Sequence, residues 1–319
     1  MTLFFTEDDV RELLPMDDAI AAVDEALRLL HDGRAVNRPR SRVRAEKLLL
    51  HVMSAGSATL GYVGLKSYTT GPSGARFYFL LFDAGSGELV SLMEADRLGQ
   101  IRTGAASGVA TRLMASKKAE RVGLYGTGWQ ARSQIEAIHC VRPLASGAVY
   151  SRSEARREAF CREMSDALGV PLSPVDSPER VPEGADIVVT ATSAREPVLR
   201  GAWLEAGQHV NAIGSNHLKR REVDEDVVRK SGVIVTDSLE QARIECGDLH
   251  ALVATGELSW DDVLPLDAIV AGTAPGRGDA DAITLFESQG LALEDVAVAK
   301  RVYESGLDKG LGRTLDLSS

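Results

Sequence analysis

A short apolar run leads into a glycine-rich turn in Val122-Gly-Leu-Tyr-Gly-Thr-Gly-Trp-Gln-Ala131. The turn has the pattern G-x-G-x-x-A. Gly126 permits a tight turn, Gly128 lets the backbone approach a pyrophosphate, and Ala131 lets the following helix pack closely on the strand. The start of that helix offers N–H groups to phosphates, so we predict a dinucleotide site rather than a purely structural turn. Its predicted cofactor contacts are Gly126, Thr127, Gly128, Gln130 and Ala131.

The residues on either side of this turn predict two kinds of sheet. After Arg121, short apolar runs alternate with helical patterns, as in a parallel, doubly wound sheet. Before it, apolar runs are joined by short glycine-containing turns, as in an antiparallel or mixed sheet. We predict an α/β fold, with a Rossmann-type domain over residues 117–292 and an α+β domain over residues 1–116, to which the chain returns at 293–319.

The end of the second predicted Rossmann strand carries information about the cofactor. Many NAD-binding proteins place Asp or Glu there, where the carboxylate bonds the ribose 2′-hydroxyl. This chain has Tyr150-Ser151-Arg152-Ser153 instead. Because a guanidinium binds phosphate in a fork, we favour NADP(H), with Ser151, Arg152 and Ser153 as contacts. NAD(H) stays possible if Arg152 is a solvated surface residue.

Small and polar residues follow the third and fourth predicted strands. Thr190 and Thr192 end the third, and Gly214 and Asn216 follow the fourth. Residues just beyond the carboxyl ends of parallel strands line the cofactor crevice, so we expect these side chains near the nicotinamide. The alternative is that they only form turns.

Composition and charge exclude several classes of protein. The net charge of −10 argues against broad binding to nucleic acid, which needs clustered Lys and Arg. The three cysteines are far apart and form no CxxC pair, so we expect neither disulfides nor a metal site. No signal peptide is evident, and no stretch approaches the roughly 20 apolar residues of a membrane span, so we expect a cytoplasmic protein without a membrane partner.

Basic residues of the first domain are candidates for binding an acid. Arg40 and Arg42 share one face of an alternating strand. Lys66 lies in an otherwise apolar strand, where a lysine at a sheet edge is the ordinary explanation. Arg102 and Thr103 open an alanine-rich helical segment, and Thr103 is a candidate cofactor contact. A positive charge at that end opposes the helix dipole unless an anion binds beside it. An ordinary ion pair of Arg102 with Glu94 or Asp96 is the alternative.

These residues give the chain a family resemblance over nearly its whole length. It resembles the ornithine cyclodeaminase/μ-crystallin family through several segments that are specific only together. The segments are Asn37–Ser41, Leu50–Met53, Gly64–Lys66, Ile101–Ser107, Gly126–Ala131, Asn211–Gly214 and Ile283–Ser288. The resemblance implies a homodimer whose first domain carries the dimer interface and part of the substrate site. It also implies that Arg40 and Arg102 hold the substrate carboxylate and that Lys66 lies beside the reacting carbon and nitrogen.

Two positions depart from the cyclodeaminases of that family. His51 stands where they have Glu, and Ser215-Asn216-His217 stands where they have Asp after the glycine. Those acids handle the second amino group and the cyclisation chemistry, so their loss argues against ornithine cyclisation. A carboxamide or imidazole can still orient an imine nitrogen, which makes His51 and Asn216 candidate catalytic residues.

The function that these observations favour is an NAD(P)-dependent oxidoreductase acting on the C–N bond of a small amino or imino acid. Ketimine reductases, pyrroline-carboxylate reductases and alanine dehydrogenases are the models that the resemblance supplies. A lysine near two arginines should have a depressed pKa, which suits proton transfer near neutrality. The alternatives are a cyclodeaminase-type lyase that recycles bound NAD, and a non-catalytic NADP-binding protein similar to μ-crystallin.

Overall fold

The computed structural model describes residues 2–317 and divides the chain into two compact units. Unit 1 comprises Met1–Arg102 and Gly290–Ser319, and unit 2 comprises Thr103–Gln289. The first boundary therefore falls inside helix α3 (Asp96–Met114), whereas the sequence placed it after that helix. The roles predicted for the two parts stay predictions.

Unit 1 is a mixed sheet covered by helices. Its strands are β1 (Thr2–Phe5), β2 (Val36–Ala45), β3 (Leu48–Ser57), β4 (Tyr62–Gly71), β5 (Gly74–Asp83), β6 (Leu89–Glu94) and β15 (Arg313–Leu315). Its helices are α1 (Glu7–Leu13), α2 (Met16–His31), α10 (Ala292–Lys309) and the first part of α3. The strand order is β15-β1-β6-β5-β4-β3-β2, with antiparallel pairing from β2 to β6. The predicted antiparallel or mixed sheet is confirmed.

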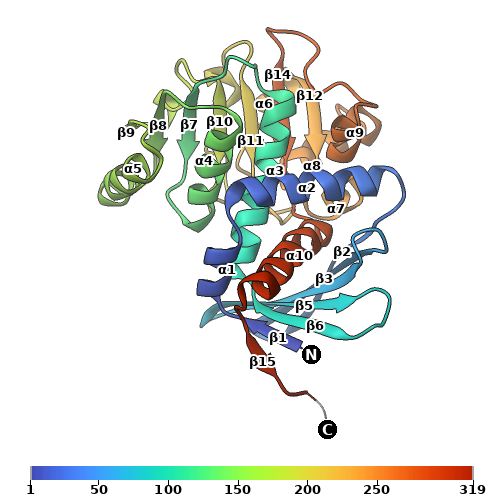
Figure 1. The fold of residues 1–319 in the computed structure, drawn as a ribbon. Coiled ribbons are helices and arrows are strands. Elements are labelled where there is room, and N and C mark those ends of the chain that lie inside the picture. Colours follow the sequence, from blue (N-terminus) through green and yellow to red (C-terminus); the bar gives the residue numbers. More distant parts are fainter. Residues whose placement is uncertain (1, 318–319) are drawn as a thin grey trace. The chain divides into compact units, whose positions relative to one another are not determined.

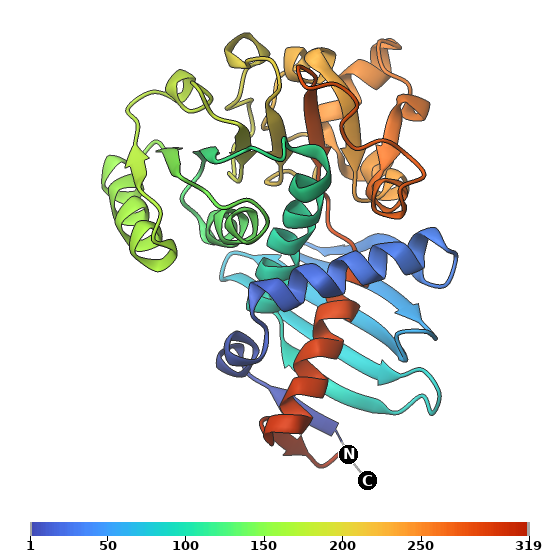
Figure 2. The same cartoon turned by 45° about the horizontal axis from the view of Figure 1, so that its top comes forward.

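Helix α10 brings the end of the chain back onto this sheet. It contacts β2, β3, β4 and β5 on one face and packs against α2 (Figure 2). The strands alternate accordingly, because successive side chains point to opposite faces. In β3, for example, His51, Met53 and Ala55 are buried and Val52 and Ser54 are half-buried. The face toward α10 is thus the core of unit 1.

Unit 2 has the predicted Rossmann-type architecture (Figure 1). Its strands are β7 (Arg121–Tyr125), β8 (Ser146–Tyr150), β9 (Leu172–Pro174), β10 (Ile187–Thr190), β11 (His209–Ala212), β12 (Ser231–Thr236), β13 (Val263–Pro265) and β14 (Ile283–Glu287). Its helices are the rest of α3, α4 (Trp129–Val141), α5 (Glu154–Leu168), α6 (Glu225–Lys230), α7 (Leu239–Glu245), α8 (Gly247–Thr255) and α9 (Leu266–Ala271), with short 3-10 turns at Pro178–Arg180, Gly201–Trp203 and Trp260–Asp262.

The strand order of unit 2 explains where a ligand would bind. The order is β13-β12-β14-β11-β10-β7-β8-β9, and every neighbouring pair of strands in it is parallel. From β7 the chain proceeds outward to β8 and β9, then returns to β10 on the other side. In open α/β sheets, ligands bind beyond the carboxyl ends of the strands at such a reversal, which here lies between β7 and β10.

Of the helices within residues 2–317, none combines the length and the apolar character that a membrane crossing needs. The cytoplasmic location is not tested by this and stays a prediction.

Candidate functional site

The glycine turn of unit 2 has the geometry that a dinucleotide requires. Gly126 has φ +107°, and a Cβ there would collide with the carbonyl of Ala191 after β10. Gly128 precedes α4, and no atom of the described residues lies within 4 Å of the position that its Cβ would take. Ala131 is fully buried against the sheet. The turn therefore fits a pyrophosphate at the start of α4.

Two further observations at α4 agree with a ligand. Within residues 2–317, no side chain caps the start of this helix. The amide oxygen of Gln130 is buried and, among the same residues, has no hydrogen-bond partner. Thr127 is half-buried. Buried polar atoms are normally paired, so an unpaired one beside an uncapped helix favours a bound polar group.

The predicted ribose site follows β8. Ser153 caps α5 by accepting a hydrogen bond from the Arg156 amide, and Ser151 Oγ donates to the Ser153 carbonyl at 3.1 Å. Arg152 is exposed between them. Both serine hydroxyls therefore have local partners, and Arg152 is the cationic group that the segment offers to solvent.

The loops after β10 and β11 are fastened by a residue that the sequence did not single out, Glu222. Its carboxylate accepts hydrogen bonds from Thr190 Oγ1 at 3.0 Å, the Thr192 amide at 2.6 Å and the Gly214 amide at 2.5 Å. Thr190 thus directs its hydroxyl to Glu222. Asn216 is exposed at the tip of the second loop. Burial raises the pKa of Glu222, while these hydrogen bonds oppose the shift.

Further buried acids lie beside Glu222. Asp248 Oδ1 accepts from the Glu222 amide at 2.7 Å, and burial raises the pKa of Asp248 to about 7. Cys246 Sγ donates to Glu287 Oε2 at 3.6 Å, and burial places the pKa of Glu287 well above its usual value. The ligand atoms of Cys246, Asp248 and Glu287 lie within 4.8 Å of one another, so these groups could hold a metal ion. Raised pKa values favour protons there instead.

Thr103 begins unit 2 within α3. It is buried, and its carbonyl accepts a hydrogen bond from Gln134 Nε2 at 3.2 Å. This bond ties α3 to α4, the helix that follows the glycine turn.

In unit 1, Lys66 lies in the middle of the sheet. It pairs with Met53 on β3 and with Phe79 on β5, and its side chain is only 3% exposed. Nζ donates to Asp295 Oδ1 at 2.9 Å. Because β4 is an inner strand and the amine is buried, the explanation of Lys66 as a sheet-edge residue is wrong.

Burial is the largest cause that lowers the pKa of Lys66, to about 8. Arg102 and Arg40 lower the pKa further by their charges, while Asp295 raises it by its charge and its hydrogen bond. The direction of this shift agrees with the prediction, but its largest single cause is burial rather than either arginine. Lys66 can therefore gain and lose a proton near neutral pH.

Arg102 is held by two acids of α10. Nη1 pairs with Glu294 Oε2 at 3.0 Å, and Nε with Asp295 Oδ1 at 3.3 Å. Since α3 begins at Asp96, Arg102 lies well inside the helix, and the expectation that it opens the helix against the dipole is wrong. These two partners lie far away in sequence, whereas the alternative named Glu94 or Asp96 as the partner.

Arg40 completes the cationic group on this face of the sheet. It is 6% exposed, and its Nε lies 3.3 Å from Met53 Sδ. Ser41 is exposed and Arg42 half-buried, as the predicted alternation requires. The fold thus brings Arg40, Lys66 and Arg102 toward α10 from β2, β4 and α3.

His51 lies in the neighbouring row across the same strands. Nδ1 accepts from Arg42 Nε at 3.2 Å, and the ring stacks on Tyr68 with centroids 4.2 Å apart. Tyr68 stacks in turn on Phe77 at 4.8 Å. Burial, together with Arg42 and Arg40, lowers the pKa of His51 to about 4. His51 is therefore a neutral imidazole at neutral pH, beside cations.

Two glycines leave room for the cationic side chains. A Cβ at Gly99 on α3 would lie 2.7 Å from Lys66 Nζ. A Cβ at Gly290, which has φ +84°, would lie 2.5 Å from Arg102 Nη1. Neither glycine can be replaced without displacing one of the two cations.

Glu294 and Asp295 were missed from the sequence, although a signal is present. They interrupt the apolar run Leu291-Ala-Leu-Glu-Asp-Val-Ala-Val-Ala299. Adjacent acids in a fully apolar helix start are almost never buried without a cationic partner. Glu294 and Asp295 could therefore have been predicted from the sequence as partners of buried cations such as Lys66 and Arg102.

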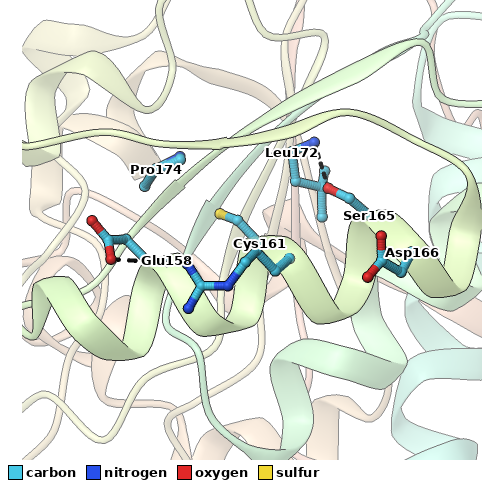
Figure 3. Close-up of a pocket in the computed structure, with 7 residues that line it drawn as sticks. Glu158, Cys161, Ser165, Asp166, Leu172 and Pro174 are labelled. Carbon is cyan, nitrogen blue, oxygen red and sulfur yellow. Dashed lines mark hydrogen bonds and ion pairs between the residues drawn. The ribbon is translucent and has the colours of Figure 1, made fainter.

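A separate surface pocket lies on α5 and β9 of unit 2 (Figure 3). Its lining residues are Glu158, Cys161, Arg162, Ser165, Asp166, Leu172 and Pro174. Burial raises the pKa of the Cys161 thiol to about 11, so this thiol is a poor nucleophile. The pocket contains none of the predicted site residues.

The family model described as "Ornithine cyclodeaminase/mu-crystallin family" matches residues 1–310. The chain belongs to the ornithine cyclodeaminase/mu-crystallin family. It is 34% identical over 320 residues to an alanine dehydrogenase of Archaeoglobus fulgidus, across 98% of this chain and 97% of that protein. The match thus covers both units of this family member.

Solved structures of relatives have the same fold. A Delta(1)-pyrroline-2-carboxylate reductase of Thermococcus litoralis, in complex with NADH and L-proline, has a TM-score of 0.94 and 34% identity, over 98% of this chain and 100% of that one. An archaeal alanine dehydrogenase dimer with bound NAD has a TM-score of 0.93 and 34% identity, over 99% of each chain. The Rossmann-type fold predicted for this family member is confirmed.

Proposed function

We propose that this protein is a nicotinamide-dependent oxidoreductase that interconverts a small imino acid and its amino acid. The observation that carries the proposal is Lys66. It is a buried lysine with a pKa of about 8, held by Asp295 and accompanied by Arg40 and Arg102. The same chain has a turn that fits a dinucleotide, and relatives named alanine dehydrogenase and pyrroline-2-carboxylate reductase match along its length.

The basic residues of unit 1 would have separate roles in substrate binding and proton transfer. Arg40 and Arg102 bind the substrate carboxylate, which fixes the reacting carbon by a charge-assisted contact. When bound, the nicotinamide supplies the hydride to carbon in reduction and accepts it in oxidation. Lys66 supplies the proton that the nitrogen gains in reduction and takes it back in oxidation.

His51 and Asn216 would act on the amine side. His51 is neutral and lies beside Arg42. It would therefore not attract a second ammonium group of the substrate, as the carboxylate of a glutamate at this position would. Arg40 and Arg42 add positive charge near it. This environment supports a reductase or dehydrogenase over an ornithine cyclodeaminase, whose substrate carries a second amine.

We propose NADP(H) as the preferred cofactor, because Arg152 is exposed directly after β8 and no acid lies in residues 150–153. The relatives with a bound cofactor contain NADH or NAD, so the preference needs a direct test. Arg152→Ala should raise KM for NADPH several-fold and leave KM for NADH nearly unchanged. A wild-type enzyme that uses NADH better than NADPH would contradict this preference.

We also propose a homodimer formed through unit 1. The sheet face opposite α10 exposes large apolar side chains, among them Val43, Val63 and Tyr78. Apolar residues gathered on one face of a sheet favour contact with another protein surface. Light scattering would give the mass in solution, and Val63→Lys should shift a dimer toward monomer.

The experiment that tests the function is a substrate panel followed by nicotinamide absorbance. It contains pyrroline-2-carboxylate, piperideine-2-carboxylate, and pyruvate with ammonium, each with NADPH and with NADH. Ornithine is assayed in parallel for ammonia. Cofactor oxidation with an imino or keto acid supports the proposal. Ammonia release from ornithine without net absorbance change would replace it with a cyclodeaminase, and tight cofactor binding without any turnover would replace it with a binding protein.

A further inference from the structure

The first turn of α10 contains two acids in an apolar setting. Glu294 and Asp295 are fully buried, and so are Leu293 and Val296 on either side of them. Removing a carboxylate from water is expensive unless cations and hydrogen bonds replace the solvent. What these acids contact therefore accounts for their presence.

One oxygen of Asp295 holds two cations. Oδ1 lies 2.9 Å from Lys66 Nζ and 3.3 Å from Arg102 Nε. The other oxygen, Oδ2, is buried and accepts no hydrogen bond from any residue between 2 and 317. Glu294 Oε2 holds the opposite side of the guanidinium at Nη1, and the Leu291 amide donates to it at 3.4 Å. The two acids thus fix both cations from one helix turn.

We propose that Asp295 and Glu294 are positioning residues of the site: Asp295 fixes the Lys66 amine and keeps it protonated, and Glu294 fixes the Arg102 guanidinium for the substrate carboxylate. This rests on the function proposed above, because it assigns Lys66 to proton transfer. Asp295 acts through Lys66, and Glu294 acts through Arg102. The competing explanation is that the acids only neutralise buried charge and stabilise the fold.

The groups that face Lys66 predict the effect of removing Asp295. Asp295 on α10 raises the pKa of Lys66, while burial, Arg102 on α3 and Arg40 on β2 lower it, and the Phe77 ring on β5 lies 5.8 Å from Nζ. Asp295→Asn keeps the size of the side chain and removes its charge. The pKa of Lys66 should then fall below its present value of about 8.

Opposite charges at such distances typically shift a pKa by about 1 to 3 units. In reduction, where Lys66 must be protonated, the alkaline limb of the kcat profile should therefore move to lower pH by about 1 unit or more. In oxidation, where Lys66 must be neutral, the acidic limb should move in the same direction. Glu294→Gln should instead raise KM for the substrate about tenfold, with the limbs unmoved.

The test measures kcat and KM against pH, in both directions, for Asp295→Asn and Glu294→Gln with the substrate that the wild type turns over. Glu304→Gln is the matched control, because Glu304 lies on the same helix, is 41% exposed and pairs with Lys300 rather than with Lys66 or Arg102. The proposal is supported if the limbs of the pH profile shift in Asp295→Asn and in neither of the other variants. It is overturned if the limbs do not move in Asp295→Asn, or if both variants only lose kcat by the same factor at every pH, because the two acids would then only stabilise the fold.

A second measurement does not depend on turnover. Nuclear magnetic resonance of lysine labelled at Nζ, with the Lys66 signal assigned from Lys66→Arg, gives the pKa of Lys66 directly. A lower pKa in Asp295→Asn supports the proposal, and an unchanged pKa overturns it. A wild type that fails the substrate panel yet shows this shift would refute the proposed function and leave the positioning intact.

If Asp295→Asn does not fold, Asp295→Glu replaces it, since this variant keeps the charge and moves the oxygen. It should leave the limbs near those of the wild type and lower kcat by about tenfold. A wild-type kcat in Asp295→Glu would overturn the positioning of the amine.

Discussion

A single methyl group at Gly99 should disable Lys66 without unfolding the protein. In Gly99→Ala the new Cβ would lie 2.7 Å from Lys66 Nζ, whereas ordinary contact begins at 3.4 Å, so the amine must move by about 0.7 Å. Nζ is already fixed at 2.9 Å from Asp295 Oδ1 and is buried, so this movement stretches an ion pair that water cannot replace.

The magnitude follows from the sensitivity of catalysis to position. A misplacement of about 1 Å can cost about a hundredfold in rate. We therefore expect kcat for Gly99→Ala to fall by about ten- to a hundredfold. The helix itself should gain stability, because Ala is favoured over Gly inside a helix by about 1 kcal/mol. The melting temperature should thus change little while the rate falls.

The assay compares kcat, KM for the cofactor and the melting temperature of Gly99→Ala with those of Gly85→Ala. Gly85 is an exposed turn glycine of unit 1 whose added Cβ would meet its nearest neighbour at 3.4 Å. Cofactor binding should be unchanged in both variants. A Gly99→Ala enzyme with the wild-type kcat would refute the placement of Lys66 in proton transfer.

The other predictions concern the amine, the turn and the buried acids. Lys66→Met should lower kcat by about a hundredfold or more while dinucleotide binding, followed by fluorescence, persists; an unchanged kcat/KM would exclude Lys66 from the chemistry. Gly126→Ala should abolish dinucleotide binding, because its φ of +107° and the Ala191 carbonyl exclude a side chain; wild-type affinity by calorimetry would contradict this. Asp248 has a pKa raised from 3.8 to about 7, so the folded state keeps a proton that the unfolded state releases, and stability should fall as pH rises from about 4 to 7. The free energy of unfolding should fall by up to about 4 kcal/mol over this range, and by less in Asp248→Asn. Urea unfolding at pH 5 and pH 7.5 measures the fall, and an equal pH dependence in both proteins would show that Asp248 is ionised throughout.

Local patterns were enough to predict unit 2. The turn from Gly126 to Ala131 and the strands around it follow from residue size and hydrophobic runs, which act over a few residues. Sheet register does not follow from such local patterns. Nor does the boundary at Arg102, because α3 has the same helical pattern on both sides of it.

The candidate site of unit 1 was predicted only in part. Lys66, Arg40 and Arg102 were candidates from the sequence, and the family resemblance supplied their roles. The acidic partners of Lys66 and Arg102 follow them by more than 190 residues in the chain. No local rule connects positions so far apart. The sequence could therefore suggest only the nearby acids Glu94 and Asp96 as partners for Arg102, whereas Glu294 and Asp295 hold it.

Glu222 has a consequence for how this protein can acquire new specificity. One buried carboxylate secures the base of the loop after β10 and the base of the loop after β11. The tip of the second loop, from Asn216 to Lys219, is exposed. On the proposed placement of Asn216 beside the substrate amine, mutations at that tip would change the substrate range while the strand ends keep their places. The tip is then the segment to randomise when the substrate range is to be changed by selection.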